Sequence, residues 1–321
     1  MNTVSYLSPV QTGLQEVETL LHAQADGAHP DLRAALKHLL SSGGKRIRPV
    51  VVLLTGQMLE GPTDKLLTLA GAVEMLHTAT LVHDDLIDGA LLRRGMPTLN
   101  ARWSPAATIL TGDYMFARAA KLAAETDNLP LMKLFADTLA TIVNGELTQL
   151  FAARGVISRE NYGKRIYAKT ASLFEMATRA AAMVSPVDEA IVEGMRQYGY
   201  NLGMAFQIVD DILDFTGEQE TVGKPVGSDL LQGLVTLPAI YYAEAHPNDP
   251  DVLCLTGGCY TEQERMERLV QSIRESDATS RSMKEAQTFV QKALDILKDM
   301  PDGVERHGLE ELAGYIINRN I

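Results

Sequence analysis

Two copies of one acidic pentapeptide, each inside a long apolar stretch, constrain the fold of this chain. The pattern Asp-Asp-apolar-apolar-Asp occupies residues 84–88 and 210–214. On a helix the first and fifth positions lie one turn apart on one face, whereas the middle aspartate (Asp85 or Asp211) is rotated by about 100° and is a weaker ligand candidate. Several converging carboxylates require cations as partners. Hard divalent ions fit best, and Mg²⁺ in particular often bridges carboxylates to substrate phosphates.

The rest of the chain has the composition of a helical protein. Ala, Leu and Met are abundant, aromatic residues make up only 6%, and alternating β-branched runs are scarce. Breaks rich in Gly and Pro fall at 43–44, 61–62, 95–97, 128–130, 185–186, 223–227 and 247–250. Between them lie segments of roughly 20 to 30 residues, as in a large helical bundle. We therefore predict an all-α fold with a single domain over 1–321, and a loop over 223–238.

Charge and cysteine content limit the possible environments and partners. The formal net charge of −12 argues against nucleic-acid binding. Cys254 and Cys259 have no metal-ligand spacing, so we expect inert thiols in a cytoplasmic protein. Residues 1–10 lack the pattern of a secretory signal, and no uninterrupted apolar run approaches the ~18 residues that span a bilayer. We expect no transmembrane segment.

Basic residues flank the first pentad in this acidic chain. The sequence GGKRIRP occupies 43–49, and Arg93 and Arg94 follow the pentad directly. Both clusters favour an anionic ligand, and the diglycine would let backbone approach a phosphate. His77 lies seven residues, close to two turns, before Asp84, so it shares the stripe of the acidic ligands, whereas His83 does not.

Further polar candidates accompany the second pentad. Gln207 lies three residues before Asp210, and Lys224 stands in the Gly-rich segment, where it could close over a phosphate. The other candidates are Lys169 and Thr170, while Glu146 and Gln149 could face either a cavity or solvent.

These motifs together resemble the trans-isoprenyl diphosphate synthases, or polyprenyl synthetases. The resemblance covers nearly the whole chain. It rests on GGKRIRP at 43–49, EMLHTATLVHDDLID at 74–88, RRG at 93–95, GDY at 112–114, GE at 145–146, KT at 169–170, GMAFQIVDDILD at 203–214, GKP at 223–225 and DL at 229–230. It implies an isoprenoid synthase bundle with a central substrate cavity, and a homodimer.

The resemblance also implies a role for each matching residue. Lys45, Arg48, His77 and Arg94 would bind the diphosphate of isopentenyl diphosphate. Asp84, Asp88 and Asp210 would hold about three Mg²⁺ per active site on an allylic diphosphate. Arg93, Lys169, Thr170, Gln207 and Lys224 would contact that diphosphate directly. Catalysis would depend most on Asp84, Asp88, Asp210, Lys169 and Lys224.

The implied reaction joins isopentenyl diphosphate to an allylic diphosphate. Metal ions make the allylic diphosphate a leaving group, and the double bond of isopentenyl diphosphate attacks the resulting cation, so no protein nucleophile is needed. Product length depends on what blocks the growing tail beneath the first pentad. Ala79 and Thr80, about one turn earlier, are not bulky, and each further turn adds ~5.4 Å, so we expect about twenty carbons or more. Met75, Met115 or Phe116 could contribute to the floor of the cavity.

One departure from the family pattern leaves alternatives open. Leu234 stands where the family has a second loop lysine, which removes one cation from the allylic diphosphate. A noncatalytic subunit of a heteromeric synthase and a class I terpene cyclase are alternatives, although the cyclase usually has a different second metal motif. A di-iron bundle would need Glu-x-x-His twice, and only Glu74 and His77 provide it.

Overall fold

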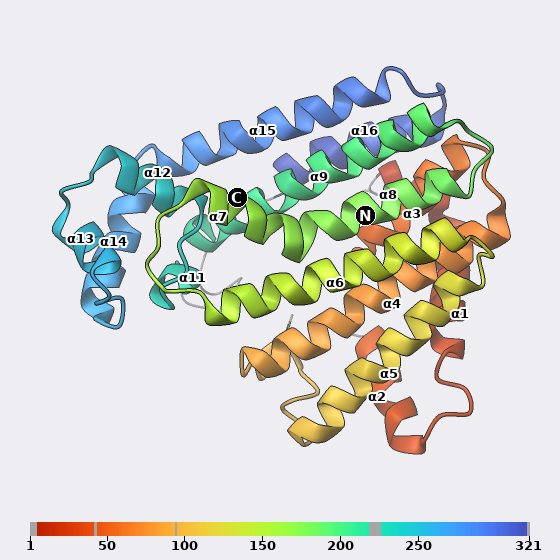
Figure 1. Ribbon diagram of the computed structural model, residues 1–321, viewed down its shortest axis with the longest axis horizontal. Helices are drawn as coiled ribbons and strands as arrows, with labels where there is room; N and C mark the ends of the chain where they lie inside the picture. The colour runs from red at the N-terminus through yellow and green to blue at the C-terminus, as the bar shows by residue number, and fades with distance from the viewer. Residues whose placement is uncertain (1–4, 42–43, 94, 218–225, 320–321) are drawn as a thin grey trace. The chain divides into compact units, whose positions relative to one another are not determined.

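The computed structural model describes residues 5–41, 44–93, 95–217 and 226–319, and it is almost entirely helical (Figure 1). Helix accounts for 76% of the chain, so the all-α prediction is confirmed. Within the described ranges the only strands are β1 (Leu92–Arg93) and β2 (Met96–Pro97), which pair antiparallel directly after the first pentad.

The chain divides into two compact units. Unit 1 comprises Met1–Thr138, Leu173–Arg196 and Asp299–Glu311, and unit 2 comprises Leu139–Ser172, Gln197–Lys298 and Leu312–Ile321. Four helices, α6 (Leu129–Phe151), α8 (Ser172–Met183), α9 (Glu189–Thr216) and α16 (Val304–Ile317), contribute residues to both. The single domain over 1–321 stays a prediction.

Unit 1 is built around helix α4, which carries the first pentad. α4 packs mainly against α5, and it also contacts α1 and α3. Apart from the shared helices, the elements of unit 1 are the 3₁₀ helix η1 (Ser5–Val10), α1 (Gln11–Ala23), α2 (Pro30–Ser41), α3 (Ile47–Met58), α4 (Thr63–Ile87), β1, β2 and α5 (Pro105–Ala124).

Helix α4 is a core helix, and its sequence explains why. Its first residue, Thr63, follows the break at Gly61 and Pro62, and Pro62 is extended with ψ 122°. Side chains such as Leu69, Val73 and Leu76 are completely buried. By length and composition alone, helix α4 is long and apolar enough to cross a membrane. However, 67% of its most apolar window is buried inside the protein, as in the central helix of a globular core.

Unit 2 contains the part of α9 that carries the second pentad. In it α12 packs against α15, and α14 contacts α11, α13 and α15. Apart from the shared helices, its elements are α7 (Arg159–Ile166), the π-helix η2 (Tyr167–Ala171), α11 (Ser228–Leu231), α12 (Leu237–Ala245), α13 (Pro250–Thr256), α14 (Gln263–Glu275) and α15 (Ala278–Leu297).

Several predicted breaks coincide with observed helix ends, and two features differ from prediction. α4, α6 and α13 begin at the expected Gly/Pro breaks. The interruption between α6 and α7 was not expected from the sequence. There Gly155 has φ 75° and its N–H donates to Gly233 O at 3.0 Å. The loop predicted over 223–238 is also partly wrong, because it contains α11 and the start of α12.

Cys254 and Cys259 form a disulfide, which corrects the expectation of free thiols. The end of α13 and the turn after it bring their Cα atoms to 5.1 Å, and Gly258 supports the turn with φ 91°. Glu262 lies close enough to complete a three-ligand group, but metal binding would require thiolates. The disulfide removes the cysteine argument for a cytoplasmic location.

Candidate active site

The first pentad lies at the C-terminal end of α4. α4 ends at Ile87, but the N–H of Asp88 still donates to Asp84 O at 2.8 Å, so the helical turn continues through the pentad. Asp84 is half-buried and Asp88 is exposed. The two carboxylates predicted to bind metal therefore lie one turn apart at the surface of unit 1.

The middle aspartate of this pentad has a protein partner. Asp85 is only 6% exposed, and Arg93 on β1 binds its carboxylate with Nε at 2.9 Å from Oδ1 and 3.1 Å from Oδ2. Nη2 of Arg93 lies 2.8 Å from the same Oδ1. This pair fixes the hairpin to the helix end. The predicted contact of Arg93 with an allylic diphosphate stays a prediction, and Arg94 lies outside the described residues.

The basic cluster before α3 divides into two groups. Arg48, in the first turn of α3, lies with Nη1 3.0 Å from His77 Nε2 on α4, and its guanidinium stacks 4.9 Å from the Phe174 ring centroid. Since guanidinium only donates hydrogen bonds, His77 Nε2 accepts this one. Arg46, with φ 46°, is instead bound to Glu74 at 2.6 Å. The structure thus brings two predicted diphosphate ligands together, while Lys45 is exposed nearby in sequence.

His83 faces α5, away from the predicted ligand stripe. Its Nε2 lies 3.3 Å from Asp113 Oδ1, and its ring stacks on Phe116 with centroids 5.0 Å apart. The ring stands against Gly112, where a Cβ would collide with it. The GDY motif thus includes the glycine that makes room for His83.

In the second pentad the middle aspartate is also buried and bound by protein groups. Asp211 is 4% exposed, and it accepts hydrogen bonds from Tyr162 OH and Gln207 Nε2, each at 2.8 Å. Burial, followed by repulsion from Asp229, raises the pKa of Asp211 to about 7, although both hydrogen bonds act to lower it. Burial likewise raises the pKa of Tyr162, which keeps its phenol protonated as the donor.

The hydrogen bonds of Asp211 extend to the KT motif. Thr170 Oγ1 donates to Gln207 Oε1 at 2.6 Å, so both ends of the Gln207 amide are fixed. Thr170 lies on the π-helix η2, a wide turn that often occurs at functional sites. Tyr162, Asp211, Gln207 and Thr170 form what we call the α9 network. Tyr162 has no motif of its own, which is why the sequence did not reveal it.

Lys169 on the same π-helix is paired with a carboxylate. Its Nζ lies 2.9 Å from Glu146 Oε1 on α6. Gly145 makes this approach possible, because a Cβ at that position would lie 2.5 Å from the Cβ of Ala168. Glu146, which the sequence left unassigned, is therefore a neighbour of Lys169, a residue predicted to bind diphosphate. The GE motif at 145–146 was the sequence feature that could have indicated this.

The two outer aspartates of the second pentad have different partners. Asp214 accepts hydrogen bonds from the backbone N–H of Ser228 and Asp229, each at 3.2 Å, and thereby caps α11. Asp210 forms an ion pair with Arg319 at 2.8 Å. Arg319 was not expected at the site, because it follows α16 and belongs to none of the motifs found in the sequence. Lys224 lies outside the described residues.

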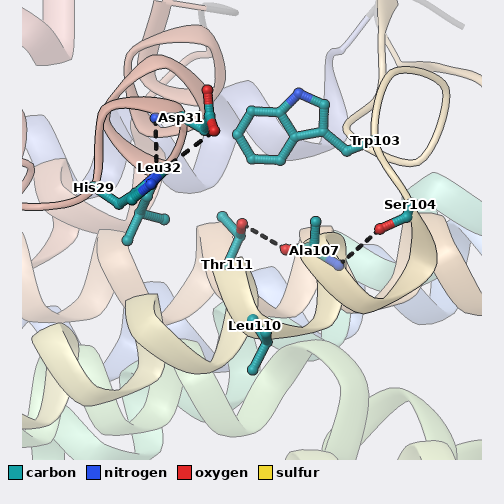
Figure 2. A pocket seen from close by; sticks show the side chains of 8 residues that line it. All are labelled: His29, Asp31, Leu32, Trp103, Ser104, Ala107, Leu110 and Thr111. Carbon is teal, nitrogen blue, oxygen red and sulfur yellow. Dashed lines mark hydrogen bonds and ion pairs between the residues drawn. The ribbon is translucent and has the colours of Figure 1, made fainter.

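A pocket of 440 Å³ in unit 1 contains none of the predicted site residues (Figure 2). It lies where α2 and α5 begin, beside the indole ring of Trp103. Its lining residues are His29, Asp31, Leu32, Trp103, Ser104, Ala107, Leu110 and Thr111. The only ion pair among them, His29 with Asp31 at 3.6 Å, joins two largely exposed side chains. The pocket therefore gives no support for a site apart from the pentads.

Comparison with known proteins identifies the family. The polyprenyl synthetase model matches residues 29–273, and this chain belongs to that family. It is 39% identical to heptaprenyl diphosphate synthase component 2 of Bacillus subtilis, over 94% of this chain and 87% of that protein.

Solved structures extend this finding to the fold. A heptaprenyl diphosphate synthase from Staphylococcus aureus has a TM-score of 0.92 at 33% identity, covering 97% of this chain and 99% of its own. A polyprenyl synthase from Caulobacter crescentus, crystallised with calcium and isoprenyl diphosphate, has a TM-score of 0.92 at 34% identity, covering 99% and 98%. The isoprenoid synthase fold is confirmed. The chain is a trans-prenyltransferase, an isoprenyl diphosphate synthase, and the cyclase and di-iron alternatives lose their support.

The donor set at the pentads fits a hard divalent cation. Asp84, Asp88 and Asp210 offer only carboxylate oxygens, the ligands that Mg²⁺ prefers, and none is fully buried. The buried aspartates already have protein partners, so they do not need a metal ion. The family is metal-dependent, which agrees with this donor chemistry.

The α9 network generates a prediction for Tyr162→Phe. Loss of the phenol hydroxyl leaves buried Asp211 with one donor fewer, which should cost about 1–3 kcal/mol in the free energy of unfolding. The carboxylate of Asp211, which orients Gln207 and through it Thr170, also loses one of its two hydrogen-bond donors, so kcat/KM should fall about tenfold. Urea denaturation and steady-state kinetics measure the two effects.

Tyr242→Phe is a matched control, because Tyr242 OH donates to Asp249 at the same 2.8 Å in unit 2. It should lose stability without losing kcat/KM. Equal activity of Tyr162→Phe and wild type would contradict a positioning role for the network.

Proposed function

We propose that the chain condenses isopentenyl diphosphate with an allylic diphosphate to make a long all-trans polyprenyl diphosphate, in a Mg²⁺-dependent reaction. The observation that carries this proposal is the difference in burial among the aspartates of each pentad. Asp85 and Asp211 are buried and bound by protein groups, whereas Asp84, Asp88 and Asp210 are partly or fully exposed. The accessible carboxylates suit metal-bridged diphosphate binding.

Mg²⁺ would supply charge neutralisation of the allylic diphosphate, and Asp84, Asp88 and Asp210 would hold it. A count of about three ions per active site is part of this proposal. The protein residues would hold the substrates. Arg48 and His77 lie within 3.0 Å of each other, and with Lys45 and Arg94 they would bind the diphosphate of isopentenyl diphosphate.

Thr170 and Gln207 form the part of the α9 network that would orient the allylic diphosphate. Their hydroxyl and amide are fixed by hydrogen bonds before substrate arrives, which lowers the cost of positioning. Lys169, with Arg93 and Lys224, would add positive charge. Leu234 is half-buried, and its N–H donates to Asp229 O at 2.9 Å, so the residue at the expected lysine position belongs to the turn after α11.

We propose a product in the size class made by the heptaprenyl diphosphate synthases that the chain resembles. Ala79 is completely buried and Thr80 is half-buried, and neither is large enough to block a growing tail beneath Asp84. A long product is consistent with both observations.

We further propose a homodimer, on the basis of one face of α6. Val143, Leu147, Leu150 and Phe151 are 44%, 48%, 54% and 81% exposed, and their spacing places them on one stripe of the helix. An exposed apolar stripe of this kind marks an interaction surface. A second copy presents the same stripe, as two-fold symmetry requires. The Bacillus subtilis relative is named as component 2 of its enzyme, so a complex with a different subunit is the alternative to a homodimer. A cytoplasmic location stays a proposal.

Substitution of the outer aspartates tests the proposed chemistry. Asp84→Asn and Asp210→Asn should each lower kcat/KM by at least about a hundredfold, because a metal-binding charge is lost. Incorporation of labelled isopentenyl diphosphate with Mg²⁺ measures this. Asp64→Asn, an exposed change at the start of α4, is the control. Full activity of both pentad variants would exclude the proposal, and lack of turnover by the isolated wild type would favour a noncatalytic subunit.

Product length should respond to Thr80→Phe. The aromatic ring would stand about one turn, or ~5.4 Å, from Asp84 and would stop the tail early. Chromatography of dephosphorylated products should show a shorter main product, whereas Thr80→Ser should leave the length unchanged. An unchanged product with Phe would show that the tail does not run along this face of α4.

The α6 stripe predicts the oligomeric state. The double variant Leu147→Glu with Phe151→Glu should convert a dimer to a monomer, because both partners would bury unpaired charge. Light scattering after gel filtration gives the mass. Leu253→Glu changes an exposed leucine of α13, 54% exposed, and should leave the dimer intact. A monomeric wild type would contradict the proposal.

A further inference from the structure

Arg319, just after α16, is bound against the second pentad. Its Nη1 lies 2.8 Å from Asp210 Oδ1, and its side chain is only 10% exposed. Nη2 donates to Phe206 O at 2.9 Å, and Nε donates to Ile316 O at 3.3 Å. The guanidinium carbon lies 4.0 Å from the centroid of the Phe206 ring. All of these residues belong to unit 2, so the arrangement is internal to one compact unit.

This contact places a permanent positive charge on a carboxylate that is expected to bind metal. Asp210 is 40% exposed, which leaves its carboxylate accessible to solvent ions as well as to the guanidinium. The arrangement differs from that of Asp211 and Asp214, which accept hydrogen bonds from neutral groups.

The other contacts of Arg319 hold it in place independently of Asp210. Phe206 lies one turn before Asp210 on α9 and provides both a carbonyl acceptor and a ring face. Ile316 O fixes the third side of the guanidinium. If Asp210 turned toward a metal ion, these contacts would keep the positive charge nearby. The guanidinium of Arg319 would therefore still repel a divalent cation bound by Asp210. This repulsion is stronger in a partly buried position than in bulk water.

We propose that Arg319 is a resident counter-cation of the second pentad. It neutralises Asp210 in the metal-free enzyme and lowers the affinity of Asp210 for a divalent ion until diphosphate adds negative charge. The metal would then load mainly together with substrate. The inference rests on the proposed function, because it takes Asp210 as a metal ligand. It makes Arg319 a positioning residue that acts through Asp210.

Metal binding without substrate tests this inference. Mn²⁺ is titrated into the full-length protein without diphosphate, and the free ion is measured by electron paramagnetic resonance, with Mg²⁺ competition as a second measurement. Arg319→Gln should bind Mn²⁺ about tenfold more tightly than wild type, the size expected for removing one charge-assisted contact. Arg319→Lys keeps the charge and should stay close to wild type. Circular dichroism checks that each variant is folded.

Two controls separate the effect from other causes. Arg306→Gln removes the same charge from α16, where Arg306 pairs with Asp302 and Glu310, and should leave Mn²⁺ affinity unchanged. In an Asp210→Asn background, Arg319→Gln should give no gain. Equal or weaker Mn²⁺ binding by Arg319→Gln would overturn the inference. If the Arg319→Gln protein still binds Mn²⁺ tightly after Asp210→Asn is added, the gain does not act through Asp210, and the inference fails. The proposed function is tested separately, by the activity of the pentad variants.

Discussion

The cost of burying a carboxylate on an apolar helix governs the site of this protein. Asp85 and Asp211 are both almost fully inaccessible to solvent, and the chain satisfies them in different ways. Asp85 receives the guanidinium of Arg93, whereas Asp211 receives two neutral donors and has its pKa raised to about 7. Each solution fixes a neighbouring segment, the β1–β2 hairpin in one case and helix α7 in the other. Of the other acidic side chains, Asp84 and Asp210 are partly exposed and Asp88 is exposed, whereas Asp214 caps α11.

Several positive charges in the motifs, and that of Arg319, are also balanced inside the protein. Arg46 binds Glu74, Lys169 binds Glu146, and Arg319 binds Asp210. Such pairs contribute little net stability where they are exposed, but they keep long side chains in defined positions. A diphosphate ligand would therefore exchange one set of ionic contacts for another. This agrees with a strongly acidic protein that binds anions at a few basic positions.

The helical architecture could be predicted from the sequence, and so could the residues of each pentad that share one face of their helix. Both follow from helical periodicity and from the Gly/Pro breaks. The partners of Asp85 and Asp211 could not be predicted in the same way, since Tyr162 is 49 residues from Asp211 and no local pattern joins them. The π-helix η2 and the break at Gly155 were missed because both depend on tertiary contacts. The disulfide between Cys254 and Cys259 was missed because its formation depends on the turn between them.

The π-helix also limits how this part of the chain can change. A π turn holds about one residue more than an α turn, and each residue along a regular helix rotates the side chains by about 100°. Tyr162 precedes η2 and Thr170 lies within it, yet both reach α9. Deletion of a single residue from Tyr167–Ala171 would rotate one of them away. Surface loops tolerate insertions and deletions well, but this short helical segment does not. Its length is therefore fixed during evolution.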